Sequence, residues 1–176
     1  MSELHFRPAE PADVGALHSL VESAYRGISA KSGWTHEADL LDGQRTDREE
    51  LEAIIADPAR QLLLAHDGDA LVGCVCIEKK NDERAYLGML TVDPEKQSGG
   101  LGRQLIAVAE QTAHQQFGAA VMEMTVIAQR PELIAYYERR GYALTTETRP
   151  FPMGDPRFGL PKRNDLYFVV MEKALA

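Results

Sequence analysis

The residues best placed to do chemistry form a glycine-rich segment at positions 97–102, Gln97-Ser98-Gly99-Gly100-Leu101-Gly102. Val92-Asp93-Pro94 ends a strand-like apolar run, and from Leu101 onward apolar residues recur at helical spacing, which places the segment at a helix start. The first N–H groups of a helix have no partner within it, and the helix dipole is positive there. Glycines also let the main chain approach a ligand closely. We therefore expect this segment to bind an anionic group such as a pyrophosphate.

Three other interpretations of these glycines differ in how well they fit. A plain strand-to-helix turn fits the glycines alone equally well. A nucleoside-triphosphate loop requires Gly-Lys-Ser/Thr, whereas Arg103-Gln104 follows Gly102, so that motif is absent. A dinucleotide-binding turn requires a small residue where Leu105 stands, and it opens a parallel β-α-β unit, so it fits poorly.

The rest of the chain predicts the elements that position this segment. Alternating apolar residues and turn signals predict strands at about 5–7, 61–66, 71–78, 85–92, 119–127, 142–147 and 166–171. Helical spacing predicts helices at about 14–24, 47–57, 101–112 and 132–140, with Asp13 and Asp47 as caps of the first two. The second to fourth strands form an antiparallel meander, followed by a strand-helix-strand-helix unit. We expect one α/β (α+β) domain over residues 1–176, with a mixed, mostly antiparallel sheet of about seven strands and about four helices.

Composition and charge exclude several classes of function. The formal net charge of -8 would repel a phosphate backbone, so we expect no nucleic-acid partner. The apolar runs are too short to cross a bilayer, and the first residues lack a secretory pattern, which predicts a cytoplasmic protein without a membrane partner. The histidines and the two cysteines, Cys74 and Cys76, are not at metal-ligand spacing. We therefore expect no metal and two buried structural thiols.

Two motifs together resemble the GNAT superfamily of acetyl-CoA-dependent N-acetyltransferases. The glycine-rich segment is similar to the family's Gln/Arg-x-x-Gly-x-Gly/Ala signature, which lies between the fourth strand and the following helix. Residues 130–142, RPELIAYYERRGY, are similar to its Asn-x-x-Ala-x-x-x-Tyr-x-x-x-Gly-Phe segment. The resemblance spans about Leu4 to Met171 and implies a GNAT-like fold. It also implies acetyl-CoA as cosubstrate and, as acceptor, an amine of a small molecule or peptide, and it allows a homodimer.

The resemblance implies roles for individual positions. Backbone groups of Leu90, Thr91 and Val92 would pair with the pantetheine arm, and the Leu90 N–H would polarise the acetyl carbonyl. Tyr137 would protonate the departing thiolate as general acid, and its alternative is a core aromatic. The residues implied at the pyrophosphate are Gln97, Ser98, Gly99, Gly100, Leu101, Gly102 and Arg103.

Two departures from the family pattern leave alternatives open. Arg130 replaces the usual Asn and Leu133 the usual Ala, so Arg130 either reaches a phosphate or is solvated. Tyr86 stands where some members have a general-base Glu. The base is therefore open between a water held by Tyr86 and three carboxylates, those of Glu78, Glu83 and Glu123.

The acceptor site is expected between two irregular loops, near residues 33–37 and 149–164. Trp34, Phe151 and Phe158 would supply apolar walls. Glu37, Asp39 and Asp155 would attract a protonated amine, although ordinary surface loops with anchoring aromatics explain the same residues. Neither cysteine lies in a Cys-His setting, which favours direct attack of the amine on the thioester. The alternative function is a non-catalytic acyl-CoA sensor or interaction domain that retains the cofactor turn.

Overall fold

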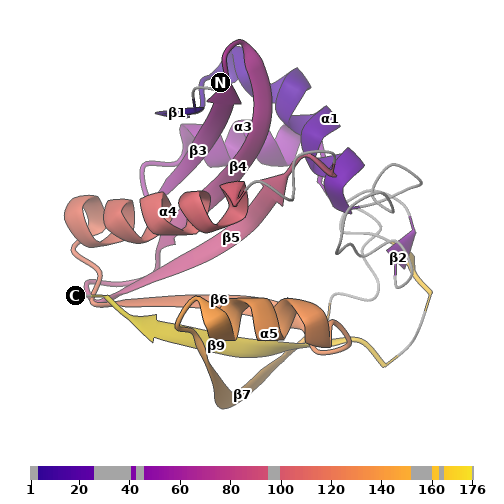
Figure 1. Cartoon of the computed structure of the whole chain (residues 1–176), viewed down its shortest axis with the longest axis vertical. Coiled ribbons are helices and arrows are strands. Elements are labelled where there is room, and N and C mark those ends of the chain that lie inside the picture. The colour runs from indigo at the N-terminus through magenta and orange to yellow at the C-terminus, as the bar shows by residue number, and fades with distance from the viewer. Residues whose placement is uncertain are drawn as a thin grey trace.

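A computed structural model describes the chain over residues 4–25, 41–42, 46–94, 100–151, 160–162 and 165–175. Its main sheet has seven strands in the spatial order β1-β3-β4-β5-β6-β9-β7 (Figure 1). These strands are β1 Leu4–Pro8, β3 Arg60–Asp67, β4 Ala70–Lys79, β5 Arg84–Val92, β6 Val121–Ile127, β7 Ala143–Pro150 and β9 Tyr167–Ala174. The described ranges contain four α-helices, α1 Val14–Tyr25, α3 Arg48–Ala56, α4 Leu101–Phe117 and α5 Pro131–Arg139. A separate two-stranded sheet pairs β2 Leu41–Asp42 with β8 Leu160–Pro161.

The predicted mixed sheet is confirmed. The strands β3, β4 and β5 form the expected antiparallel meander, and Gly68 in the tight turn between β3 and β4 has φ +60. β5 and β6 are parallel, while every other neighbouring pair in this sheet is antiparallel. β9 lies between β6 and β7, so the last strand of the chain is not at the edge of the sheet.

Alternating side chains give the sheet two apolar faces. On β3, Leu63 and Ala65 join the core beneath α4 and α5, whereas Leu62 and Leu64 join the core beneath α1 and α3. This alternation follows from the two-residue period of a strand. The fold is thus a three-layer arrangement over the meander, with helices on both faces of the sheet (Figure 1).

The parallel pairing of β5 with β6 is short. Register pairs run only from Arg84–Val121 to Tyr86–Glu123, after which the two strands diverge (Figure 1). The remainder of β5, residues 87–92, pairs with β4 on its other side. The divergence creates a wedge in the sheet between β5 and β6.

Of the two predicted helix N-caps, the structure confirms Asp47 at α3 but not Asp13 at α1. Asp47 is the N-cap of α3, and its carboxylate accepts a hydrogen bond from the Glu50 N–H at 2.7 Å, as predicted. Asp13 was expected to cap α1, which is wrong, because a short 3-10 helix, Pro11–Asp13, precedes it. Asp13 instead accepts the Glu10 N–H at 2.8 Å and pairs with Arg7, which ties the start of this turn to β1. No helix in the described ranges has the length and apolar character needed to span a membrane.

Candidate active site

The glycine-rich segment leads into α4, as its sequence predicts. Gly100 is the N-cap of α4 and has φ +76, a left-handed conformation that glycine adopts without strain. It has no side chain that could cap the first N–H groups of α4, so these point outward at the positive end of the helix dipole. Gln97, Ser98 and Gly99 lie outside the described residues. The described part of the turn therefore has the donor arrangement that binds an anion.

Gly102 lies where three elements converge. A Cβ atom at this position would be 3.0 Å from the Tyr136 hydroxyl of α5 and 3.7 Å from the Val92 side chain of β5. Leu101 beside it is buried in the core and fixes the helix start against the sheet. Gly102 therefore allows the start of α4 to pack closely against Tyr136 and Val92, and a larger residue would push these elements apart.

A β-bulge interrupts β5 just before the predicted pantetheine-binding residues. Cys74 is opposite Thr91 and Cys76 is opposite Gly88, so β5 carries one extra residue at this point. Met89 lies within this bulge and has φ +51. Its carbonyl oxygen accepts a hydrogen bond from the Thr91 hydroxyl at 2.9 Å. Bulges of this kind redirect backbone groups and are frequent beside active sites. The sequence carries no signal for it, because methionine is not a residue typical of positive φ.

The residues Leu90, Thr91 and Val92 lie on the part of β5 that has diverged from β6. They follow the bulge and lead to the glycine-rich turn, so the wedge, the bulge and the start of α4 are contiguous along the chain. A ligand that extended along residues 90–92 of β5 would thus lead directly to the turn. The residues present fit coenzyme A in this respect.

The chain matches a known protein family and shares its fold with solved structures. Residues 35–151, more than half of the chain, match the model of the acetyltransferase (GNAT) domain. The chain belongs to the GNAT acetyltransferase family. It is therefore an acyltransferase, as its motifs predict.

Several solved structures share the fold of this GNAT acetyltransferase at low sequence identity. A putative acetyltransferase, yncA of Salmonella typhimurium, with its cofactor acetyl-CoA, has a TM-score of 0.70 at 18% identity, covering 98% of this chain and 94% of its own. Spermidine N-acetyltransferase of Vibrio cholerae, in complex with CoA and spermine, gives 0.71 at 19%, covering 98% and 95%. The ribosomal-protein-S18-alanine N-acetyltransferase of Escherichia coli gives 0.71 at 16%, covering 99% and 95%. No curated protein sequence matches the chain.

In this GNAT acetyltransferase, Tyr137 is buried on α5, with a relative exposure of 6%. Its ring makes edge contacts with the rings of Tyr136 and Tyr142, at centroid distances of 5.5 and 6.2 Å. The predicted acid, Tyr137, therefore lies in a cluster of three tyrosine rings with edge contacts, and its catalytic role stays a prediction. Tyr136 was not among the predicted site residues, although its hydroxyl approaches Gly102. Burial raises the pKa of the Tyr136 phenol above its usual value.

Arg130 and Arg103 lie at the starts of two different helices. Arg130 is the N-cap of α5 and is almost fully buried, with its Nε 3.9 Å from a Glu132 carboxylate oxygen. The Arg103 side chain is exposed on the first turn of α4. Arg130 therefore is not simply solvated, and its contact with a phosphate stays a prediction.

A polar cluster lies at the apex of the wedge, on the face of the sheet opposite α4 and α5. Tyr86 and Glu123 are register partners there, and the Tyr86 hydroxyl makes a hydrogen bond to the Thr125 hydroxyl of β6. Their neighbours along each strand, such as Leu87 and Met124, point into the core beneath α4 and α5, so these polar groups point the other way. An acceptor entering from this face would meet them first.

The three candidate carboxylate bases differ in setting. Glu123 is buried, with a relative exposure of 5%, and accepts a hydrogen bond from Arg149 at 2.9 Å, with Arg84 at 3.6 Å. Protonating it would disrupt this ion pair, which disfavours a base role. Glu78 lies opposite Tyr86 on β4, near the Lys80 ammonium at 3.8 Å, and Glu83 is exposed at the turn before β5.

The two thiols are buried as predicted, in the core beneath α1 and α3. Burial raises the pKa of the Cys76 thiol to about 12, so it stays protonated near neutral pH and is a poor nucleophile. The Cys74 thiol donates to the Met89 carbonyl at the bulge, at 3.6 Å. Neither thiol is placed for a covalent acyl intermediate. Of the predicted acceptor residues, Phe151 is buried against Phe168 in a small core, which argues against its role as a wall of an open site. The others lie outside the described residues, namely Trp34, Glu37, Asp39, Asp155 and Phe158.

Proposed function

We propose that this GNAT acetyltransferase binds acetyl-CoA in the wedge between β5 and β6 and transfers the acetyl group directly to a primary amine. The observation that supports this most is the contiguous run of bulge, diverging strand and left-handed N-cap at Gly100. It offers strand-edge backbone to an extended arm and helix-start N–H groups to a pyrophosphate. When bound, acetyl-CoA would supply an activated acyl group as a thioester.

The roles proposed for the chain follow from this placement. Backbone groups of Leu90, Thr91 and Val92 would align the ligand, and the N–H groups from Ser98 to Arg103 would hold its pyrophosphate. The Tyr137 hydroxyl would donate a proton to the departing thiolate. The buried thiols support direct attack by the amine, since no described cysteine is available as a nucleophile.

The amine is proposed to approach from the opposite face of the sheet, where the Tyr86–Thr125 pair lies. The net charge of -8 favours the encounter with a cationic amine. Related folds belong to enzymes that act on amines, as in the spermidine and ribosomal-protein alanine N-acetyltransferases. We propose Glu37, Asp155 and the Trp34 ring as parts of the acceptor site.

The reaction is tested by incubating the purified protein with acetyl-CoA and a panel of amines while CoA release is followed by thiol titration. The panel includes polyamines, amino acids and peptides with free N-termini. Turnover with any primary amine supports the proposal. Tight CoA binding without turnover across the panel would contradict direct N-acetylation.

The acceptor assignment is tested with the best amine from that panel. Because Glu37 and Asp155 are proposed to attract a cation, Glu37→Gln and Asp155→Asn should each raise KM several-fold, on the order of the effect of one screened charge. Acetyl-CoA affinity should be unchanged. A wild-type KM in both variants would move the acceptor site elsewhere.

The cofactor site is tested by Gly102→Val, which should lower CoA affinity at least tenfold by calorimetry, because a branched side chain on the first turn of α4 would hinder the close approach of a pyrophosphate to the backbone. The new side chain would also meet the Tyr136 hydroxyl. The double variant Gly102→Val with Tyr136→Phe removes that internal contact and is the matched control. Affinity restored in the double variant would mean that a displaced α5, and not a blocked ligand, caused the loss.

A further inference from the structure

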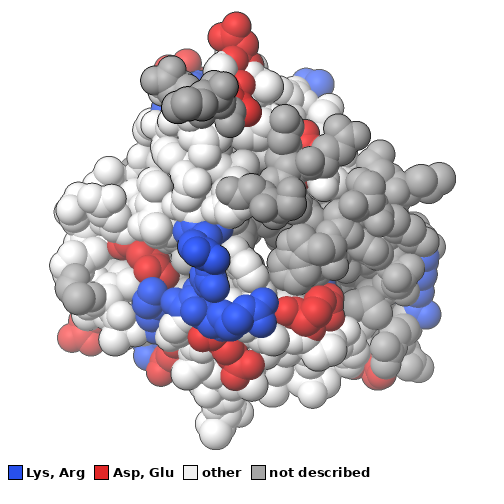
Figure 2. Space-filling view, in the orientation of Figure 1, with Lys and Arg blue, Asp and Glu red and all other residues white. Residues whose placement is uncertain are grey.

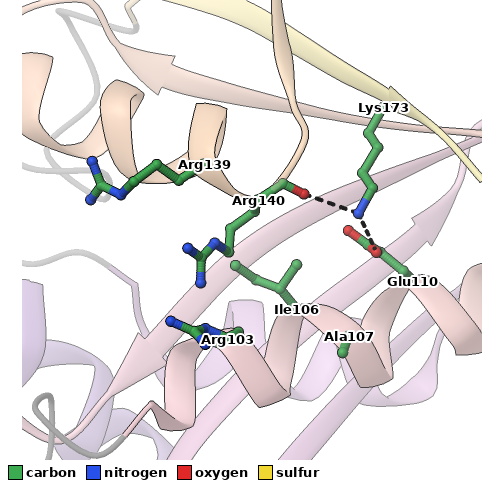
Figure 3. Close-up of a pocket in the computed structure, with 7 residues that line it drawn as sticks. All are labelled: Arg103, Ile106, Ala107, Glu110, Arg139, Arg140 and Lys173. Carbon is green, nitrogen blue, oxygen red and sulfur yellow. Dashed lines mark hydrogen bonds and ion pairs between the residues drawn. The ribbon is translucent and has the colours of Figure 1, made fainter.

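Basic side chains gather in one cleft of this acidic protein, between α4 and α5. The cleft has a volume of about 340 Å³ and is lined by Arg103, Ile106, Ala107, Glu110, Arg139, Arg140 and Lys173. Figure 2 shows Lys and Arg side chains concentrated on this face of the molecule. In Figure 3, Arg103 from α4 and Arg140 from α5 approach one another across the gap, and Arg139 extends on the same side.

The charges in this cleft are not balanced. Its one carboxylate, Glu110, already accepts hydrogen bonds from the Lys173 ammonium and the Tyr142 hydroxyl, both at 2.9 Å. Lys173 is further held by the Arg140 carbonyl at 3.0 Å. Within the described ranges no carboxylate pairs with Arg103, Arg139 or Arg140, so three guanidinium groups remain for a ligand.

Arg140 has the clearest unmet hydrogen-bonding capacity of the three. Its guanidinium lies over the Tyr136 ring, 5.2 Å from the centroid, which holds it at the cleft. Its Nε is buried and has no hydrogen-bond partner among the described residues. A buried donor without an acceptor is unfavourable, and an anion in the cleft would supply the acceptor.

The cleft adjoins the glycine-rich turn. Tyr136 has its hydroxyl 3.0 Å from the position of a Cβ at Gly102, and Arg103 is the next residue of α4. The guanidinium charges of Arg140, Arg103 and Arg139 all lower the pKa of the Tyr136 phenol, against the larger effect of burial. One tyrosine is thus near both the turn and the three arginines.

We propose that this cleft is a subsite for a phosphate monoester, supplied by the 3′-phosphate of coenzyme A bound at the neighbouring turn. This inference rests on the proposed cofactor site. Coenzyme A carries a ribose 3′-phosphate in addition to its pyrophosphate, and a phosphate monoester is close to a dianion at neutral pH. Guanidinium groups match its oxygens in geometry and charge. The cleft would make the enzyme selective for coenzyme A over the same molecule without that phosphate.

The test compares CoA with 3′-dephospho-CoA by calorimetry at low salt. We expect the wild type to bind CoA about tenfold or more tightly, the effect of one or two charge-assisted hydrogen bonds. The double variant Arg139→Gln with Arg140→Gln should lose most of this preference, since only Arg103 of the three arginines remains, and higher salt should reduce the wild-type preference. Arg139→Gln alone, at an exposed position, should lose part of the preference even if the double variant folds poorly. Arg48→Gln, the same charge change on α3 across the sheet, should retain it.

The outcomes separate this inference from the proposed function. Equal wild-type affinity for the two ligands would overturn the 3′-phosphate assignment while leaving the cofactor site intact, whereas binding of neither would contradict the cofactor site itself. A preference that survives the loss of Arg139 and Arg140 would also overturn the assignment. Inorganic phosphate is titrated into the dephospho-CoA complex as a further arm. If phosphate binds through the arginines while the two ligands bind equally, the cleft serves a free phosphate monoester and coenzyme A is not its source.

Discussion

Two adjacent tyrosines on α5, Tyr136 and Tyr137, lie in different surroundings. Tyr137 is buried among aromatic rings, as a positioned acid or a core residue would be, whereas Tyr136 reaches the glycine-rich turn and the basic cleft. Adjacent residues on a helix point about 100° apart, so they can face different sites. At the scale of single residues, the structure places the Tyr136 hydroxyl at the glycine-rich turn, and the acid role of Tyr137 stays a prediction.

Replacing Tyr137 with Phe tests the acid role, because it removes the hydroxyl and keeps the ring contacts with Tyr136 and Tyr142. We expect kcat to fall about a hundredfold or more, with unchanged CoA affinity. Initial rates and calorimetry on the same preparation provide both readouts. Tyr136→Phe is the matched control and should keep kcat. Wild-type turnover in Tyr137→Phe would assign Tyr137 to the core.

At the scale of elements, short local interactions fix how strands lead into helices. Asp13 joins β1 to the turn before α1 through a bidentate pair with Arg7, at 2.8 and 2.9 Å, and through the Glu10 N–H. Asp47 performs the capping role at α3. The side-chain hydrogen bond from Arg7 is the main cause that lowers the pKa of the Asp13 carboxyl.

Asp13→Asn should therefore destabilise the protein by about 1 kcal/mol or less at neutral pH, since the pair is partly exposed. A carboxylate with a lowered folded-state pKa stabilises the fold above its unfolded pKa, and this contribution is lost as pH falls through the folded pKa. The difference between variant and wild type should thus shrink once the pH falls below the usual carboxyl pKa and towards the lowered one. Urea unfolding from about pH 7 down to pH 3 measures it. Exposed Glu52→Gln is the control, and a difference independent of pH would contradict the ion-pair explanation.

At the scale of the whole molecule, α4 sits close to the sheet because β4 has a glycine beneath it. A Cβ at Gly73 would be 2.8 Å from the Leu105 side chain and 2.9 Å from the Thr91 carbonyl oxygen. Leu105 is fully buried, and Thr91 follows the β5 bulge. The contact therefore couples helix placement to the strand that carries the proposed cofactor site.

Gly73→Ala should lower the free energy of unfolding by about 1–3 kcal/mol, because either α4 or β5 must move. Weaker CoA binding should accompany the loss, since both elements contribute to the proposed site. Gly15→Ala is the matched control, because this helical glycine faces only the flexible end of Arg48, and alanine favours the helix. Equal stability of Gly73→Ala and wild type would show that the layers are not coupled through this contact.

The sequence by itself determined the features that depend on neighbouring residues. The turn at Gly68, the cap at Asp47 and the helix start after Gly100 follow from turn chemistry and apolar period, and the two motifs were sufficient to predict the family. The predicted cap at Asp13 is the exception, because the Asp13 carboxylate forms an ion pair with Arg7 of β1 and does not cap α1.

Only the tertiary structure decided the features that join distant segments. The short β5–β6 pairing, the bulge at Met89 and the hydrogen bond between the Tyr86 and Thr125 hydroxyls depend on strand register, which local periodicity does not encode. The basic cleft brings Arg103 together with Arg139, Arg140 and Lys173 from two other elements. In the sequence these residues are separate charges on a chain of net charge -8, and only the tertiary arrangement of α4, the end of α5 and β9 brings them to one cleft.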